Sequence, residues 1–327
     1  MKEDKYLSKK YTNCLRGICA IIVVIHHLYQ YTGLFANTHI GILLGLSGAL
    51  AVSVFFFYSG YGLMLSSTKK NYVQSFFRSR FLPLYCFYVV LVILYSFWTL
   101  WIEHTISLDQ FLHSFLFGKT IVTNGWYLQA TFFLYLMYLF SFSTFKTTKT
   151  QILGITVAVF VYCVFCRFLN LGAWWYQTIP CVVLGMVYCS MKTQIDILLN
   201  KYAWIIFIIS GVMFAIFYII ISVFVKEPVF NAIYFIFFVC TVISFSYILC
   251  DTPIINNSFF ALCGKYSLEI YVSHGLFLRL IRLNIINNKF IYILTVIVGT
   301  IIMSVILEKI YTQIIPSLFR NKYRIHK

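Results

Sequence analysis

The chain has 327 residues, of which 61% are hydrophobic and only 10% are charged, and its mean hydropathy is +0.87. A soluble domain carries roughly 25% charged residues, so this composition excludes a chain whose whole surface faces water. The net charge of +16 does not require a nucleic-acid partner, because the sequence contains no soluble basic domain and a basic membrane face attracts anionic lipid.

The apolar residues come in long blocks, and a hydrocarbon layer about 30 Å thick needs roughly 20 apolar helical residues to cross it. Lipid offers no partner to backbone N–H and C=O groups, so the sequence predicts an all-α, polytopic bundle of transmembrane helices. We expect about ten spans, at about 17–33, 41–65, 81–102, 126–144, 151–169, 174–191, 203–225, 230–250, 266–283 and 290–314. Because these spans run through nearly the whole chain, we expect a single membrane-embedded domain over 1–327, with short tails at about 1–15 and 315–327.

Ten spans place both termini on the same side of the membrane. Nineteen of the 25 basic residues fall in loops and tails on that side, so the positive-inside rule predicts that both termini are cytoplasmic. Three of the six exceptions, Arg279, Arg282 and Lys289, cluster after the ninth span, and the sequence offers no explanation for them.

The ten cysteines point to no special chemistry. Most fall inside apolar blocks, where cysteine is typically a small buried hydrophobe. Cys163 and Cys166 form a C-x-x-C pair, but no second pair accompanies it, so we expect no metal site.

The first span carries polar side chains that are costly in lipid and therefore mark a functional candidate. Arg16 lies at its cytoplasmic mouth, and His27 lies eleven residues further on, about 16 Å deeper at the helical rise. His26 and His27 point about 100° apart, so they face different neighbours. Histidine suits proton transfer near neutral pH. The alternative is two structural histidines that hydrogen-bond within the bundle.

A basic segment precedes the third span. Arg78 and Arg80 stand just before Pro83, and Lys69 and Lys70 lie in the same loop. These cations predict either a positive anchor at the membrane interface or a clamp for a phosphorylated ligand on the cytoplasmic face.

Polar and aromatic residues in three other spans complete the candidate site. Glu269 lies about one turn into the ninth span, where a buried carboxylate needs either an ion-pair partner or a catalytic role, and His274 follows five residues later. Ser59 stands among small residues that favour close helix packing. Trp126 and Tyr127 open the fourth span and suit either an interfacial aromatic belt or sugar stacking.

These pieces resemble acyltransferase family 3, a family of multispan membrane O-acyltransferases. The resemblance covers nearly the whole chain and rests on five motifs in the family's order: Arg16-Gly17 through His27; Phe55-Phe56-Phe57-Tyr58-Ser59-Gly60-Tyr61; Arg78-Ser79-Arg80-Phe81-Leu82-Pro83-Leu84-Tyr85; Asn124-Gly125-Trp126-Tyr127-Leu128; and Tyr266-Ser267-Leu268-Glu269-Ile270-Tyr271 with His274. The chain departs from the family at Ser53, where an acidic residue is common, and in the tighter spacing of Arg78 and Arg80.

The resemblance implies an enzyme that moves an acyl group to a carbohydrate hydroxyl, most simply acetyl from cytoplasmic acetyl-CoA to a cell-surface glycan or a lipid-linked sugar. It implies His27 as catalytic base or acyl relay, with Arg16 as support on the donor side. Arg78, Arg80 and Lys70 would then bind the donor. We expect a multi-pass protein of the cytoplasmic membrane with no tightly bound cofactor. The alternatives are a transporter or flippase for a lipid-linked glycan and a structural partner in polysaccharide export. Transporters often show internal repeats, and none is evident here.

Overall fold

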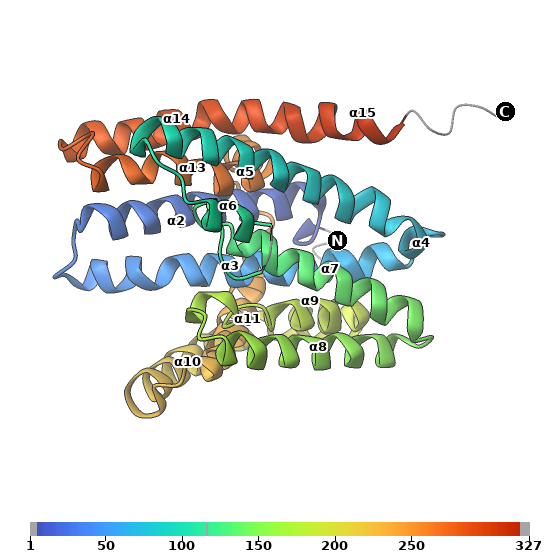
Figure 1. Ribbon diagram of the computed structural model, residues 1–327. Helices are drawn as coiled ribbons and strands as arrows, with labels where there is room; N and C mark the ends of the chain where they lie inside the picture. Colours follow the sequence, from blue (N-terminus) through green and yellow to red (C-terminus); the bar gives the residue numbers. More distant parts are fainter. Residues whose placement is uncertain (1–4, 116, 321–327) are drawn as a thin grey trace. The chain divides into compact units, whose positions relative to one another are not determined.

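A computed structural model describes residues 5–115 and 117–320 (Figure 1). In the first half of the chain the helices are α2 (Lys9–Thr32), α3 (His39–Ser67), α4 (Tyr72–Phe76), η1 (Phe77–Phe81), α5 (Leu82–Glu103), α6 (Leu108–His113), α7 (Trp126–Thr144) and α8 (Thr148–Phe168). They are followed by η2 (Ala173–Trp175), α9 (Cys181–Ser190), α10 (Lys192–Ile220), η3 (Ile221–Val225), η4 (Pro228–Phe230), α11 (Asn231–Leu249), α12 (Ser258–Lys265), α13 (Ser267–Arg282), α14 (Lys289–Lys309), η5 (Ile310–Ile314) and α15 (Ile315–Arg320).

The described residues contain no strand, and the predicted all-α, polytopic class is confirmed. Among these residues, seven helices are long and apolar enough to cross a membrane. Only 11% of the most apolar window in Lys192–Val225 is buried within the protein, as expected for a helix whose sides contact lipid. The predicted spans at 126–144 and 266–283 are helical, and the one at 174–191 is α-helical only over Cys181–Ser190; all three fall outside the seven. α9 and α13 have only 10 and 16 residues, and α7 is rich in Tyr, Ser and Thr. The number of ten spans and the side of the termini remain predictions.

The predicted boundaries differ most at the starts of three helices, because α9 begins at Cys181 and not near residue 174, α10 begins at Lys192 and not near residue 203, and α2 also begins early. α2 begins at Lys9, not near residue 17, because Ser8 caps the helix by accepting a hydrogen bond from the Tyr11 amide at 3.3 Å. α14 continues through η5 and α15, so the predicted tail from residue 315 begins as helix. The tail residues Lys2, Lys322, Arg324 and Lys327 lie outside the described residues.

A π-helical turn, η1, leads into α5 and carries Arg78 and Arg80. The Leu82 amide donates to the Phe77 carbonyl, five residues back. Pro83 follows directly and has no N–H to donate to the carbonyl four residues earlier. π turns of this kind are frequent at functional sites.

The chain divides into two compact units, and each takes segments from distant parts of the sequence. Unit 1 consists of residues 5–26, Ile42–Tyr72 and Phe140–Lys265, and unit 2 consists of His27–Gly41, Val73–Leu139 and residues 266–320. Helices α2 and α3 each contribute to both units. The assignment of 1–327 to a single domain stays a prediction.

In unit 1 the segment before α2 is anchored by a buried tyrosine. The Tyr6 side chain is fully buried, and its hydroxyl donates to Asp196 and lies 2.7 Å from the Tyr188 hydroxyl. Burial raises the pKa of this hydroxyl. Lys192 pairs with the same carboxylate, and Lys5 pairs with Asp251 at 2.7 Å.

Two glycines allow α3 and α9 of unit 1 to cross with their backbones in contact. A Cβ on Gly60 would collide with the Val182 carbonyl oxygen, and a Cβ on Gly185 would collide with the Phe57 carbonyl oxygen. Small residues are used in this way where helices associate in lipid.

Gly60→Ala should therefore destabilise the protein by about 1–3 kcal/mol, because the crossing helices must move apart. The matched control is Gly62→Ala on the same helix, where a Cβ would meet nothing within 4 Å and alanine favours helix. Thermal unfolding in detergent should show a lower midpoint for Gly60→Ala alone. Equal midpoints for the two variants would show that the α3–α9 crossing is not close.

Candidate functional site

Helix α13, in unit 2, is held through its backbone carbonyls by side chains of α5 and α14. The Tyr95 hydroxyl donates to the Val272 carbonyl at 2.7 Å, and Trp98 Nε1 donates to the Leu276 carbonyl at 2.7 Å. From α14, the Tyr292 hydroxyl donates to the Leu278 carbonyl at 3.0 Å. These bonds satisfy buried polar groups and fix the position of α13 along both neighbours.

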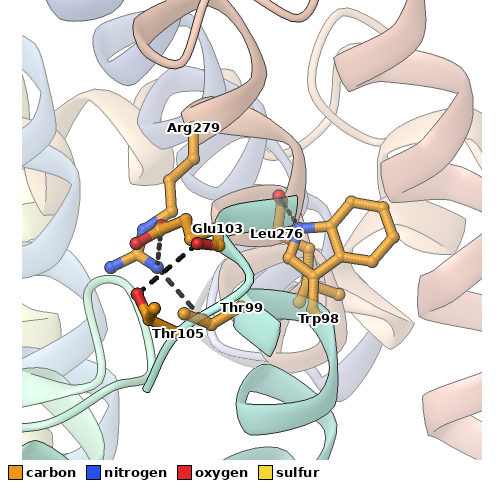
Figure 2. A network of polar contacts seen from close by, with 6 residues as sticks. All are labelled: Trp98, Thr99, Glu103, Thr105, Leu276 and Arg279. Carbon is orange, nitrogen blue, oxygen red and sulfur yellow. Dashed lines mark hydrogen bonds and ion pairs between the residues drawn. The ribbon is translucent and has the colours of Figure 1, made fainter. Parts of the chain in front are cut away.

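An ion pair joins the last turn of α13 to the last turn of α5 (Figure 2). Arg279 Nη1 lies 2.9 Å from Glu103 Oε1 and donates to Thr99 Oγ1 at 3.1 Å. The pair accounts for Arg279, which the charge bias of the loops leaves unexplained. Arg282 and Lys289 are exposed, and nothing in the structure explains their position.

His274 lies on α13 and is fully buried. Its Nδ1 lies 3.0 Å from the Ile270 carbonyl oxygen, and its Nε2 lies 3.3 Å from the side-chain nitrogen of Asn124. A carbonyl only accepts and an amide NH₂ only donates. These contacts match the tautomer with the proton on Nδ1, and both ring nitrogens have partners.

His27, near the end of α2, stacks on His274. Their ring centroids are 5.2 Å apart and the rings are inclined by 24°. His27 Nδ1 lies 2.8 Å from Gln30 Oε1, which accepts, so this contact matches a proton on Nδ1. The contacts of the two neighbouring imidazoles thus match the same tautomer in different surroundings.

Asn124 ends the loop that precedes α7, and its backbone is left-handed, with φ of 60°. Asparagine tolerates this conformation better than most residues. The Tyr271 hydroxyl donates to its carbonyl at 3.2 Å. Gly275, next to His274, leaves room for this loop, since a Cβ there would lie 2.7 Å from Thr123 Cβ.

The buried Gln129 on α7 holds the same loop from the other side. Its Oε1 accepts from the Gly118 amide at 3.1 Å, and its Nε2 donates to the Tyr88 hydroxyl at 3.1 Å. The Tyr88 hydroxyl in turn donates to the Ser114 carbonyl at 2.8 Å and lies 2.8 Å from Thr120 Oγ1. One amide and one phenol thus fix the loop that carries Asn124.

The other predicted residues of unit 2 differ in their place relative to this pair of histidines. Tyr127 contacts Tyr271, with centroids 5.1 Å apart, and Trp126 lies against Tyr127 at 6.1 Å. Tyr271 lies 6.0 Å from His274. Glu269 is 3% exposed in the first turn of α13, where the helix dipole favours a carboxylate. Arg78 and Arg80 are exposed in η1.

Four predicted residues belong to unit 1: Arg16, His26, Ser59 and Lys70. His26 Nδ1 lies 2.7 Å from the Leu44 carbonyl oxygen, so this imidazole ties α2 to α3. The Ser59 hydroxyl donates to the Phe55 carbonyl of its own helix at 2.9 Å. Arg16 is half-buried and Lys70 is exposed.

Sequence analysis missed Gln129 and Tyr95 as members of this network. The available signal was a polar side chain inside an apolar block, which is costly unless it is hydrogen-bonded. Within the described ranges, no group of three or more His, Cys, Asp or Glu side chains could hold a metal ion.

A protein-family model described as "Acyltransferase domain" matches residues 9–309. The matched range includes both units and every residue of the site described above. No curated protein and no solved structure matches the chain with significance.

The loop network yields a test by hydrogen exchange. Gln129→Leu should remove the bonds to Gly118 and Tyr88 and destabilise the closed loop by about 1–3 kcal/mol. Amides of residues 117–125 should then exchange faster than in the unmodified protein. The control is Gln151→Leu, which removes a single bond to the Phe145 carbonyl. Equal protection of the loop in all three proteins would show that Gln129 does not hold it.

Proposed function

The chain belongs to the acyltransferase domain family, and from this premise we propose that it moves acetyl from cytoplasmic acetyl-CoA to a hydroxyl of a cell-surface glycan or lipid-linked sugar. Its apolar helices make it a membrane protein. Residence in the cytoplasmic membrane follows from the donor, because CoA thioesters are made in the cytoplasm. Family membership favours acyl transfer over the transporter that the composition alone would also allow.

The observation that carries the proposal is the state of His27. A sugar hydroxyl is a poor nucleophile at neutral pH and needs a base within hydrogen-bond reach. His27 offers a basic Nε2, and its Nδ1–H is oriented by Gln30 at 2.8 Å. An imidazole whose second nitrogen is held in this way is the usual form of a general base.

In the direct route, the acceptor oxygen attacks the thioester carbonyl while its proton passes to His27 Nε2. The C–S bond then breaks, and the CoA thiolate leaves with the proton that His27 received. In the relay route, Nε2 attacks the thioester and the C–S bond breaks, which gives an acyl-imidazolium and the CoA thiolate. The sugar oxygen then attacks the acyl carbon, the C–N bond breaks, and the hydroxyl proton passes to the thiolate, so CoA leaves as the thiol. Both routes use the same nitrogen and end with neutral His27.

The donor side of the proposal rests on charge. CoA carries phosphates, and Arg78 and Arg80 are exposed cations on the π turn that opens α5. The planar guanidinium group suits bidentate contacts with phosphate. Lys70 adds an exposed cation in the preceding loop. Arg16, eleven residues before His27 along α2, would add support on the donor side.

The acceptor side rests on aromatic side chains near His274. Trp126, Tyr127 and Tyr271 form a continuous set of ring contacts, and aromatic faces bind the apolar faces of sugars. Glu269, buried near the start of α13, remains a candidate for orienting a hydroxyl.

His27→Gln should reduce transfer of radiolabelled acetyl from acetyl-CoA to surface glycan by about 10²-fold or more, the usual contribution of a general base. The control is His39→Gln, which changes an exposed histidine at the start of α3. Both variants must insert in the membrane at normal levels. Undiminished labelling by His27→Gln would remove His27 from the chemistry.

Arg80→Ala should weaken acetyl-CoA binding by about 10- to 100-fold, since a charge-assisted contact to phosphate contributes roughly 1.5–3 kcal/mol. Isothermal calorimetry in detergent measures this directly, and the difference should shrink in high salt. Arg282→Ala, which removes another exposed arginine, serves as the control. If both variants bind acetyl-CoA as the unmodified protein does, Arg80 is not part of the donor site.

A further inference from the structure

We propose that Asn124 is a positioning residue that holds His274 as the neutral, Nδ1-protonated tautomer and thereby fixes the ring on which His27 stacks. The inference builds on the proposed function, because it assigns different roles to the two histidines. His27 acts on the reacting atoms, and His274 acts through His27.

The first step is the hydrogen-bond pattern of His274. Its Nδ1–H is directed to the Ile270 carbonyl of its own helix, and its Nε2 accepts from the Asn124 amide at 3.3 Å. If His274 Nε2 were protonated, its N–H would face the N–H of the Asn124 amide, and neither group could accept. With both nitrogens engaged and the ring fully buried, His274 is unsuited to receive a proton or an acyl group.

The second step is the consequence for His27, whose ring lies 5.2 Å from that of His274. In either route His27 becomes positively charged or acylated during turnover. A second cation at this distance would oppose that step, whereas a neutral ring offers a flat, polarisable surface. Asn124 therefore favours the chemistry by keeping the neighbouring ring neutral and in place.

The third step is how the fold holds Asn124. Its left-handed backbone, the Tyr271 hydroxyl on its carbonyl and the Gln129 network behind the loop all fix its amide. The position needs a residue that tolerates positive φ and also carries an N–H donor. Glycine meets only the first need, and aspartate lacks the donor. These two residues therefore separate backbone effects from side-chain effects.

The test uses the full-length protein in lipid nanodiscs with ¹⁵N-labelled histidine. Magnetic resonance distinguishes protonated from unprotonated ring nitrogens, and His274→Gln assigns the signals of His274. The unmodified protein should show protonated Nδ1 and unprotonated Nε2. Asn124→Asp should convert His274 to the doubly protonated form. In the Asn124→Gly variant, His274 should no longer hold a single tautomer. Asn284→Gly is the matched control, because Asn284 also has positive φ, of 55°.

Activity is the second readout. Asn124→Gly should lower kcat about tenfold with little change in KM, a smaller loss than that of His27→Gln. Unchanged His274 signals in both Asn124 variants, or an undiminished kcat in Asn124→Gly, would overturn the proposal. The spectra require no substrate. If they change as expected while His27→Gln remains active, the proposed function fails and the tautomer assignment stands.

Discussion

The structure of unit 2 depends on the cost of leaving a polar group unsatisfied away from water. His274 is fully buried, and such a group is tolerated only when its hydrogen bonds are complete. Ile270 and Asn124 complete them, and Asn124 is in turn held by Tyr271 and by a loop that Gln129 closes. The stacking of His27 on His274 depends on all of these contacts, because they hold the His274 ring in place. The polar contacts of α5, α7 and α13 thus converge on one pair of imidazoles.

This arrangement gives the acyltransferase assignment a physical basis. The family match states the class of reaction, and the different surroundings of the two histidines support the proposal that His27 is the base and His274 its support. The ion pair of Arg279 with Glu103 and the bonds from Tyr95 and Trp98 secure α13 along α5. The side chain of His274 is therefore placed by rigid helices and by a fixed loop, as a precise site requires.

The sequence predicted the class of fold, because long apolar blocks leave few alternatives to helix in lipid, but it placed the starts of α2, α9 and α10 several residues away from where they lie. It also predicted that His26 and His27 face different neighbours, since helical geometry alone requires it. It did not predict the contact between His27 and His274, which are 247 positions apart along the chain. Gln129 and Tyr95 were missed because their partners are a backbone amide, a phenol and a carbonyl, which leave no pattern in the sequence. The ion pair of Arg279 with Glu103 was also missed, because it depends on Glu103 lying at the end of α5, next to α13.

The central claim is that His27 and His274 act as one unit in acyl transfer, with the reacting atoms at His27 alone. A double-mutant cycle on acetyl transfer, with His27→Gln, His274→Gln and the combined variant, measures this coupling directly. The account predicts that the double variant is no slower than His27→Gln, because His274 has no role once the base is gone. If the two losses multiply, the histidines act independently and the account is wrong.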